Sequence, residues 1–346
     1  MRILKLTPET QNDILQNLLK RSPNNYGEFE GRVNAIIEEV RKNRDQAIFS
    51  YTKQFDGADI NADNILVTEA EIQEAYEQVD ETLLSVIRKS LVNIKKYHEK
   101  QMQNSWFTSE DGIILGQKVT ALATVGVYVP GGKAVYPSSV LMNVLPAKVA
   151  GVDRIVMCTP PGKDGKVYAS TLVAAKEAGV DEIYKVGGAQ AIAAMAFGTE
   201  SVPKVDKIVG PGNIYVALAK KAVFGYVSID SIAGPSEILV LADDTANPRY
   251  VAADLLSQAE HDELASAILV TTSKELAEKV SAQVDDFKSR LSRKEIISKS
   301  IDNYGYILVA DTMQDAIDTV NEIASEHLEV VTANPFDTMT RIQNAG

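Results

Sequence analysis

Two short stretches combine side chains that could bind a metal or move a proton. The first, DLLSQAEHDE at residues 254–263, contains His261 three residues after Gln258 and seven after Asp254. On a helix these spacings place the three side chains on one face. Imidazole and side-chain oxygens suit zinc, although glutamine is an unusual ligand, and a hydrogen-bonded polar stripe has the same spacing. The residues alone leave a metal site and a structural role open.

The second stretch, SEHLEVV at residues 325–331, places an acid beside an imidazole. Glu326 and His327 lie where a helical pattern gives way to a strand-like run. Such a pair can share proton transfers near neutral pH. A single charged dipeptide in a loop is weak support, so catalysis and an ordinary surface turn both stay open.

Two other reactive side chains are better explained by structure than by chemistry. His98 ends a helical pattern among charged residues, which indicates a solvated surface histidine. Cys158 ends the apolar run IVMC with no base nearby in the sequence. A buried structural cysteine is therefore favoured over a thiol nucleophile.

Three glycine-rich turns each follow an apolar run and precede a helical one. They are YVPGGK (128–133), VGGAQA (186–191) and VGPGNIY (209–215). Glycines let backbone N–H groups approach a phosphate, and the next helix offers its positive end. None matches a dinucleotide fingerprint or a P-loop, and each alone could be an ordinary turn. Three in succession favour a nucleotide or phosphate site. In a fourth turn, AGPSEIL (233–239), Ser236 directly precedes an expected strand.

The elements that would position these residues change in type along the chain. The first hundred residues read as helical, with helix starts at Thr7–Pro8 and at the Thr68–Glu71 capping box. From about residue 119, β-rich runs alternate with helical ones, which predicts parallel sheets covered by helices. The expected strands lie at 125–129, 154–158, 182–186, 207–210, 237–243, 266–272 and 305–311.

Composition excludes several classes of protein. The 346 residues carry a net charge of −12, so binding to nucleic acid is not expected. No apolar run is long enough to span a membrane, and the apolar N-terminal run is too short for a signal peptide. The single cysteine rules out an internal disulfide framework. We therefore expect a soluble cytoplasmic protein without a membrane partner.

Taken together, these segments resemble the histidinol dehydrogenase family. The resemblance covers the chain from about residue 20 onward and includes the glycine-rich turns, the GPSE turn, SQAEHD and SEHLEVV. It implies an NAD-dependent, zinc-containing homodimer in histidine biosynthesis. Such an enzyme performs the last step, the oxidation of L-histidinol to L-histidinaldehyde and then to L-histidine.

The resemblance also implies an α/β fold with two incomplete Rossmann-like parallel-sheet domains and a helical N-terminal region. We expect the helical region at residues 1–118, packing partly on the second domain. The first Rossmann-like domain, with the NAD groove, is expected at 119–245. The second is expected at 246–346.

Matching motifs assign roles to individual residues. The family's zinc ligands correspond to Gln258 and His261, and its catalytic acid and base correspond to Glu326 and His327. Its NAD contacts correspond to Tyr128, Gln190 and Asn213. Its substrate contacts correspond to Ser236, Gln258, His261 and His327. The family motif does not include Asp254. We predict that it contacts a zinc ligand and orients it.

One departure from the family pattern concerns the end of the sequence, RIQNAG. In the family a further segment supplies an aspartate and a partner-subunit histidine that complete the zinc site. We therefore expect a truncated chain with weak zinc binding and little turnover, since zinc sites need at least three protein ligands.

Three other functions stay open. A related dehydrogenase could act on another small amino- or sulfo-alcohol, or the chain could bind NAD without catalysis. An aldehyde dehydrogenase that uses Cys158 is the least favoured.

Overall fold

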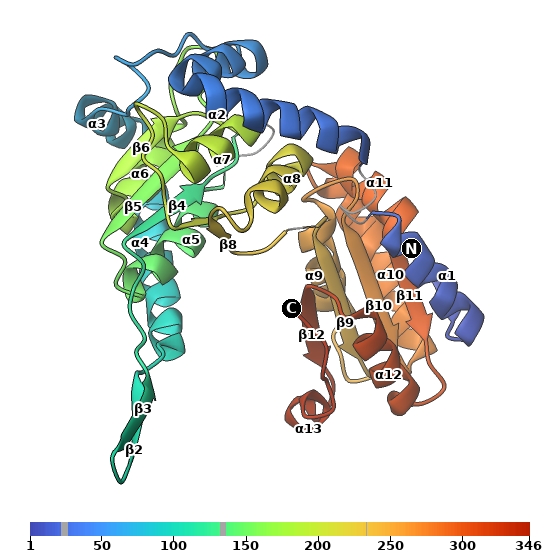
Figure 1. Ribbon diagram of the computed structural model, residues 1–346. Helices are drawn as coiled ribbons and strands as arrows, with labels where there is room; N and C mark the ends of the chain where they lie inside the picture. Colours follow the sequence, from blue (N-terminus) through green and yellow to red (C-terminus); the bar gives the residue numbers. More distant parts are fainter. Residues whose placement is uncertain (22–26, 132–135, 233) are drawn as a thin grey trace. The chain divides into compact units, whose positions relative to one another are not determined.

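The computed structural model contains two compact α/β units, each built on its own sheet (Figure 1). The structure describes residues 1–21, 27–131, 136–232 and 234–346. One unit comprises residues 26–233, and the other comprises residues 1–25 together with 234–346. The expected α/β fold with two Rossmann-like parallel sheets is confirmed.

The unit of residues 26–233 has a five-stranded parallel sheet in the order β6-β5-β4-β7-β8. Its strands are β4 (Thr124–Tyr128), β5 (Arg154–Thr159), β6 (Glu182–Lys185), β7 (Lys207–Val209) and β8 (Ser228–Ile229). The chain starts in the middle at β4, moves outward to β6 and then returns to the other side of β4. This is the order of an incomplete Rossmann fold, with its topological switch point between β4 and β7.

Helices cover both faces of this sheet. The described residues form α2 (Gly27–Asp56), α3 (Glu69–Gln78), α4 (Glu81–His98), α5 (Pro137–Val149), α6 (Ala169–Ala178), α7 (Gly188–Phe197), α8 (Ile214–Val223) and a 3₁₀ helix at Glu99–Gln101. Strand side chains alternate between the faces. On β5, Met157 packs in the core of α3 to α6, whereas Cys158 packs in the core of α2, α7 and α8.

A hairpin interrupts the region that was expected to be helical. Strands β2 (Trp106–Glu110) and β3 (Ile113–Gln117) pair in antiparallel fashion, and every residue of both strands is exposed. Trp106, Phe107 and Ile114 are among the exposed apolar side chains. The helical description of residues 1–118 is therefore wrong for this segment, although the helix starts at Thr7 and Thr68 are confirmed.

The second unit has a five-stranded parallel sheet in the order β1-β11-β10-β9-β12. Its strands are β1 (Arg2–Lys5), β9 (Glu237–Ala242), β10 (Ser266–Thr271), β11 (Gly305–Val309) and β12 (His327–Val331). Its helices among the described residues are α1 (Pro8–Leu19), α9 (Pro248–Ala259), α10 (Lys274–Arg290), α11 (Lys294–Tyr304), α12 (Met313–Ile323) and α13 (Pro335–Met339). Helices α9 to α11 cover one face, and α1 and α12 cover the other.

The expected boundary between residues 245 and 246 differs from the boundary in the structure. Strand β9 lies between β10 and β12, so the second sheet already begins at Glu237. At the other end of the sequence, β1 pairs with β11 through Ile3 and Ile307. Both strands belong to the second sheet because the strands they pair with lie in that sheet.

Among the described residues, no helix combines the length and apolar character needed to cross a membrane.

Candidate active site

The acid and imidazole of the SEH motif lie at the amino end of a strand, beside the GPSE turn. Strand β12 starts at His327 and pairs in parallel with β9, with His327 opposite Ile238. Ser236 therefore lies next to the start of β12, directly before β9. These two strands form the switch point of the second sheet, since β10 follows β9 on its other side. The pairing brings together two motifs about 90 residues apart in the sequence.

A backbone carbonyl sets the proton position on His327. The His327 Nδ1 atom lies 3.1 Å from the carbonyl oxygen of Glu237. A carbonyl oxygen can only accept a hydrogen bond, so Nδ1 carries the proton and Nε2 is left as the basic nitrogen. The Glu326 carboxylate lies 3.4 Å from the same Nδ1 and accepts a 3.4 Å hydrogen bond from the Glu237 N–H. Both side chains are about half exposed, at 51% and 55%, so a substrate can reach them.

The QAEH motif lies at the same edge of this sheet. Helix α9 follows β9 and runs back along the sheet, so its carboxyl end returns to the edge where β10 begins. Gln258 lies in the last turn of α9 and is half-buried, whereas His261 is exposed. The helix ends at Ala259, so His261 lies in the following turn, where its N–H donates to the Gln258 carbonyl at 3.0 Å. We expected Gln258 and His261 to lie on one helix, but only Gln258 does. Both residues nevertheless lie at the carboxyl end of α9.

Asp254, which we expected to support a zinc ligand, contacts a second carboxyl group in the structure. Its carboxyl group hydrogen-bonds to that of Glu329 on β12. Burial, followed by the hydrogen bond to Asp254 and its negative charge, raises the pKa of Glu329 to about 7. Within the described residues, no group of three or more His, Cys, Asp or Glu side chains could hold a metal ion. Gln258 and His261 thus supply at most part of a ligand set here.

The predicted nucleotide contacts lie at the carboxyl ends of strands in the first sheet. Tyr128 ends β4, is buried, and accepts a 3.1 Å hydrogen bond from the Gly188 N–H through its hydroxyl. Burial raises the pKa of Tyr128 to about 12, so this hydroxyl stays neutral. Gln190, in the first turn of α7, is buried, and its Oε1 atom has no hydrogen-bond partner among the described residues. Asn213 caps α8 by accepting from the Tyr215 and Val216 N–H groups.

Glycines allow the turns at this edge to pack closely. A Cβ atom on Gly210 would lie 2.1 Å from the carbonyl oxygen of Tyr128, and Gly210 has φ +115°. A Cβ on Gly131 or Gly187 would lie within 2.7 Å of the Pro160 ring. Only glycine fits such approaches. The YVPGGK turn is described as far as Gly131; the rest of it lies outside the described residues.

Comparisons with known proteins agree with this arrangement. A family model described as histidinol dehydrogenase matches residues 19–346. The chain belongs to the histidinol dehydrogenase family. This membership confirms the resemblance found in the motifs and the expectation of an oxidoreductase.

The similarity to individual family members extends over the whole chain. A histidinol dehydrogenase of Caldanaerobacter subterraneus is 55% identical over 346 residues, covering 100% of this chain and 80% of that protein. The Bacillus subtilis histidinol dehydrogenase is 60% identical over 315 residues, covering 91% of this chain and 73% of that protein. The crystal structure of histidinol dehydrogenase from Elizabethkingia anophelis has a TM-score of 0.93 at 37% identity, covering 100% of this chain and 79% of that one.

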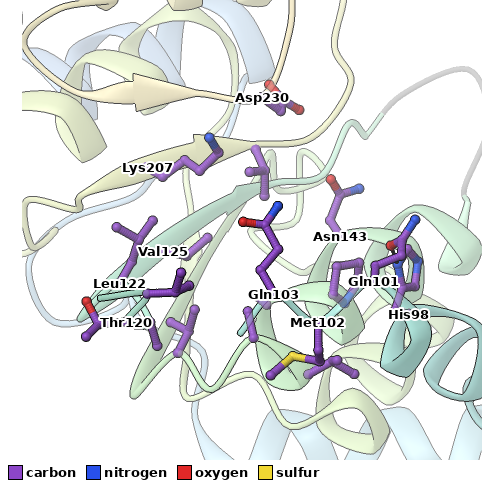
Figure 2. A pocket seen from close by; sticks show the side chains of 18 of the residues that line it. His98, Gln101, Met102, Gln103, Thr120, Leu122, Val125, Asn143, Lys207 and Asp230 are labelled. Atoms are coloured by element: carbon purple, nitrogen blue, oxygen red, sulfur yellow. Dashed lines mark hydrogen bonds between the residues drawn. The ribbon is translucent and has the colours of Figure 1, made fainter. Parts of the chain in front are cut away.

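The buried cysteine and a pocket in the first unit are not part of this candidate site. Cys158 is fully buried, and burial raises the pKa of its thiol, which disfavours the thiolate needed for attack. A pocket of about 510 Å³ in the first unit contains none of the predicted site residues (Figure 2). His98, expected as a solvated surface histidine, is partly exposed; it lines this pocket and bonds to Gln101 at 2.6 Å.

Sequence reasoning missed three charged residues that support the motifs. Glu237 supplies the backbone contacts to Glu326 and His327, and its carboxylate binds Arg21 at 2.8 Å. Lys220 is buried and binds the Gly210 carbonyl. No local pattern distinguishes these residues from surface charges, but their partners in the fold explain why Arg21 and Lys220 are buried.

Proposed function

We propose that this chain oxidises L-histidinol to L-histidine through L-histidinaldehyde, with NAD as hydride acceptor. The contact between His327 Nδ1 and the Glu237 carbonyl carries the proposal, because it leaves Nε2 as a base beside a carboxylate. Family membership and the names of the relatives support L-histidinol as the substrate. The expected last step of histidine biosynthesis is part of this proposal, as is a cytoplasmic location.

His327 is the proton acceptor in both oxidations. In the first, Nε2 takes the hydroxyl proton while the carbinol carbon releases a hydride to NAD, which leaves the aldehyde. The nearby Glu326 carboxylate stabilises the imidazolium that forms, since its oxygen lies 3.4 Å from Nδ1.

Glu326 acts between the two oxidations. Its carboxylate takes a proton from a water that attacks the aldehyde carbon, and the His327 imidazolium gives its proton to the carbonyl oxygen, which yields the hydrate and returns His327 to its neutral form. His327 then takes a proton from a hydrate hydroxyl while the second hydride leaves, which gives the carboxylic acid of L-histidine; the acid then releases its remaining proton to water and becomes the carboxylate. The imidazole of His327 thus serves both oxidations, and the carboxylate of Glu326 serves the hydration between them. Both side chains are accessible to substrate.

The NAD site is proposed at the carboxyl edge of the first sheet. Tyr128, Gln190 and Asn213 would contact the dinucleotide, and the amino ends of α7 and α8 would face its pyrophosphate. The unpartnered Oε1 atom of Gln190 supports this, because a buried amide oxygen without a partner is costly unless a ligand donates to it.

Gln258 and His261 are proposed as two zinc ligands. An imidazole and an amide oxygen suit the ion, and both lie at the carboxyl end of α9, where the helix dipole favours a cation. When bound, zinc would orient the substrate beside Ser236 and His327. The described residues do not complete a ligand set, so no chemical step is assigned to the metal.

A homodimer is proposed as the working assembly. The hairpin of β2 and β3 exposes Trp106, Phe107, Ile113, Ile114 and Leu115. An isolated two-stranded hairpin is marginally stable in water, and clustered exposed apolar side chains mark an interaction surface. Sedimentation of the full-length protein would test the dimer.

The variant Glu326→Gln tests the assignment of the two half-reactions. NADH formation is measured separately from L-histidinol and from L-histidinaldehyde. We expect aldehyde oxidation to fall by about 10²-fold or more and alcohol oxidation by less than about tenfold, because general base catalysis contributes about 10²–10⁴-fold. The control Glu278→Gln removes an exposed carboxylate on α10 and should preserve both rates.

Equal losses in both half-reactions would refute this division of labour. Activity of the unmodified protein on another amino- or sulfo-alcohol but not on L-histidinol would replace the proposed substrate. NAD binding without NADH formation from any such alcohol would indicate a binding module instead.

A further inference from the structure

An ion pair between a buried lysine and a partly exposed aspartate holds both polar backbone atoms of Gly210. The Gly210 N–H donates to an Asp230 carboxylate oxygen at 2.8 Å. The Gly210 carbonyl accepts from the Lys220 ammonium at 2.9 Å. Lys220 and Asp230 also pair directly with each other, and their side chains are 3% and 31% exposed. We call Lys220 and Asp230 the Gly210 clamp.

The clamped peptide lies between two of the proposed NAD contacts. Gly210 packs directly on the Tyr128 carbonyl, where a Cβ atom would be only 2.1 Å away. Three residues later, Asn213 caps α8. Between them, a Cβ on Gly212 would lie 2.3 Å from the Val216 side chain. Any change in the Gly210 dihedral angles therefore moves Asn213 and the amino end of α8 relative to Tyr128.

Core packing does not explain the lysine. The buried residues of α8 are otherwise apolar, and burying an ammonium group is costly unless it is paired and hydrogen-bonded. The next residue, Lys221, is partly exposed and pairs with Glu30 at 3.1 Å. The role of Lys220 is thus tied to its specific partners. Because the clamp bonds to both polar atoms of Gly210, it fixes the shape of the turn.

We propose that Lys220 and Asp230 are positioning residues that hold the turn of residues 210–213 in the conformation that accepts NAD. The inference rests on the proposed NAD site. Glycine at φ +115° has wide conformational freedom, so an unclamped turn would populate the binding-competent form only part of the time. Apparent affinity falls by that same fraction, while the chemistry of the bound state is unchanged.

The test compares two charge-neutral double variants of the full-length protein. Lys220→Met with Asp230→Ala removes both contacts to Gly210, whereas Lys220→Met with Asp230→Asn keeps an acceptor for its N–H. Removing both charges together avoids a buried unpaired ion. NAD binding is measured by titration calorimetry, and kcat and the KM for L-histidinol are measured at saturating NAD.

We expect the dissociation constant for NAD to rise by about tenfold or more in the first variant, and by less in the second. The kcat and the KM for L-histidinol should change by less than about threefold, because the clamp does not touch the reacting groups. Lys221→Met, on the same helix, should leave NAD binding unchanged. Lys207→Met should do the same; Lys207 lines the pocket that Asp230 also lines (Figure 2), and its ammonium group bonds to the Ser228 hydroxyl at 3.2 Å.

Two outcomes separate this inference from the proposed function. If the unmodified protein binds NAD and both double variants bind it within about twofold, the clamp has no positioning role. If the unmodified protein does not bind NAD, the proposed nucleotide site itself is wrong. If the double variant with Asp230→Ala does not fold, the double variant with Asp230→Asn and the single variant Lys220→Met are compared with the unmodified protein. Unchanged NAD affinity in both of these variants would overturn the inference.

Discussion

Replacing Arg21 should destabilise the unit that carries the acid and imidazole. The Arg21 guanidinium is 2% exposed, pairs with the Glu237 carboxylate at 2.8 Å and donates to the Leu264 carbonyl at 2.6 Å. Its charge also lies 4.9 Å from the centre of the Tyr304 ring. The variant Arg21→Met removes these contacts and leaves the Glu237 carboxylate without this partner.

The expected loss follows from the burial of this pair. Breaking a buried ion pair by removing one partner costs about 3–5 kcal/mol. Glu237 is 29% exposed, so water can solvate part of its charge, and we take the lower end, about 3 kcal/mol. For a unit of this size, about 3 kcal/mol corresponds to a fall of about 6–12 °C in Tm. Differential scanning calorimetry would measure the change.

Arg2→Met is a closely matched control. Arg2 also donates to a carbonyl, that of Asn303 at 2.7 Å, and lies 4.1 Å from the centre of a tyrosine ring, that of Tyr306. Because Arg2 is exposed, its loss should cost less than about 1 kcal/mol. Adding Glu237→Gln to Arg21→Met should recover part of the loss, since no unpaired charge remains. Equal effects of Arg21→Met and Arg2→Met would refute the reasoning from burial.

Two further predictions concern titratable groups. The pKa of Glu329 is raised to about 7 by burial and by Asp254, so the folded protein holds a proton that the unfolded chain releases near its ordinary value of 4.5. Stability should therefore fall as pH rises between about 4.5 and 7, and urea unfolding of Glu329→Gln should lack this slope; identical pH profiles would contradict the assignment. Cys158 should resist iodoacetamide in the folded protein and react after unfolding, because it is buried and its thiol pKa is raised. Rapid labelling of the folded protein with loss of activity would instead revive the thiol mechanism.

Local sequence patterns predicted the repeating parts of the fold well. Each apolar run expected as a strand after residue 119 overlaps a strand in the structure, because β-rich runs bounded by glycines and helical patterns are a short-range signal. The capping boxes at Thr7 and Thr68 mark real helix starts for the same reason. The glycine-rich turns also lie at strand ends as expected, since their conformations depend on neighbouring residues.

Long-range partners decided what the patterns could not predict. The segment Arg2–Lys5 is too short to be recognised as a strand without β11, about 300 residues away. The adjacency of Ser236 and His327 depends on the pairing of β12 with β9, which no local spacing encodes. Lys220 looks like a surface lysine on α8 until the Asp230 carboxylate and the Gly210 carbonyl are placed around it.

Four neighbouring strands have the same order in the two sheets, β6-β5-β4-β7 and β11-β10-β9-β12, but the two proposed sites lie beside opposite helix ends. In the first unit the predicted contacts lie at the carboxyl edge, where α7 and α8 begin and their unsatisfied N–H groups favour an anion such as pyrophosphate. In the second unit the motifs lie at the amino edge, where α9 ends and its carbonyl groups favour a cation beside Gln258 and His261. The shared order of four strands would therefore suit the proposed dinucleotide at one edge and the proposed zinc ion at the other. Moving the acid and imidazole to the carboxyl edge of the second sheet would bring them to helix amino ends, where a proposed cation would be disfavoured and an imidazolium destabilised.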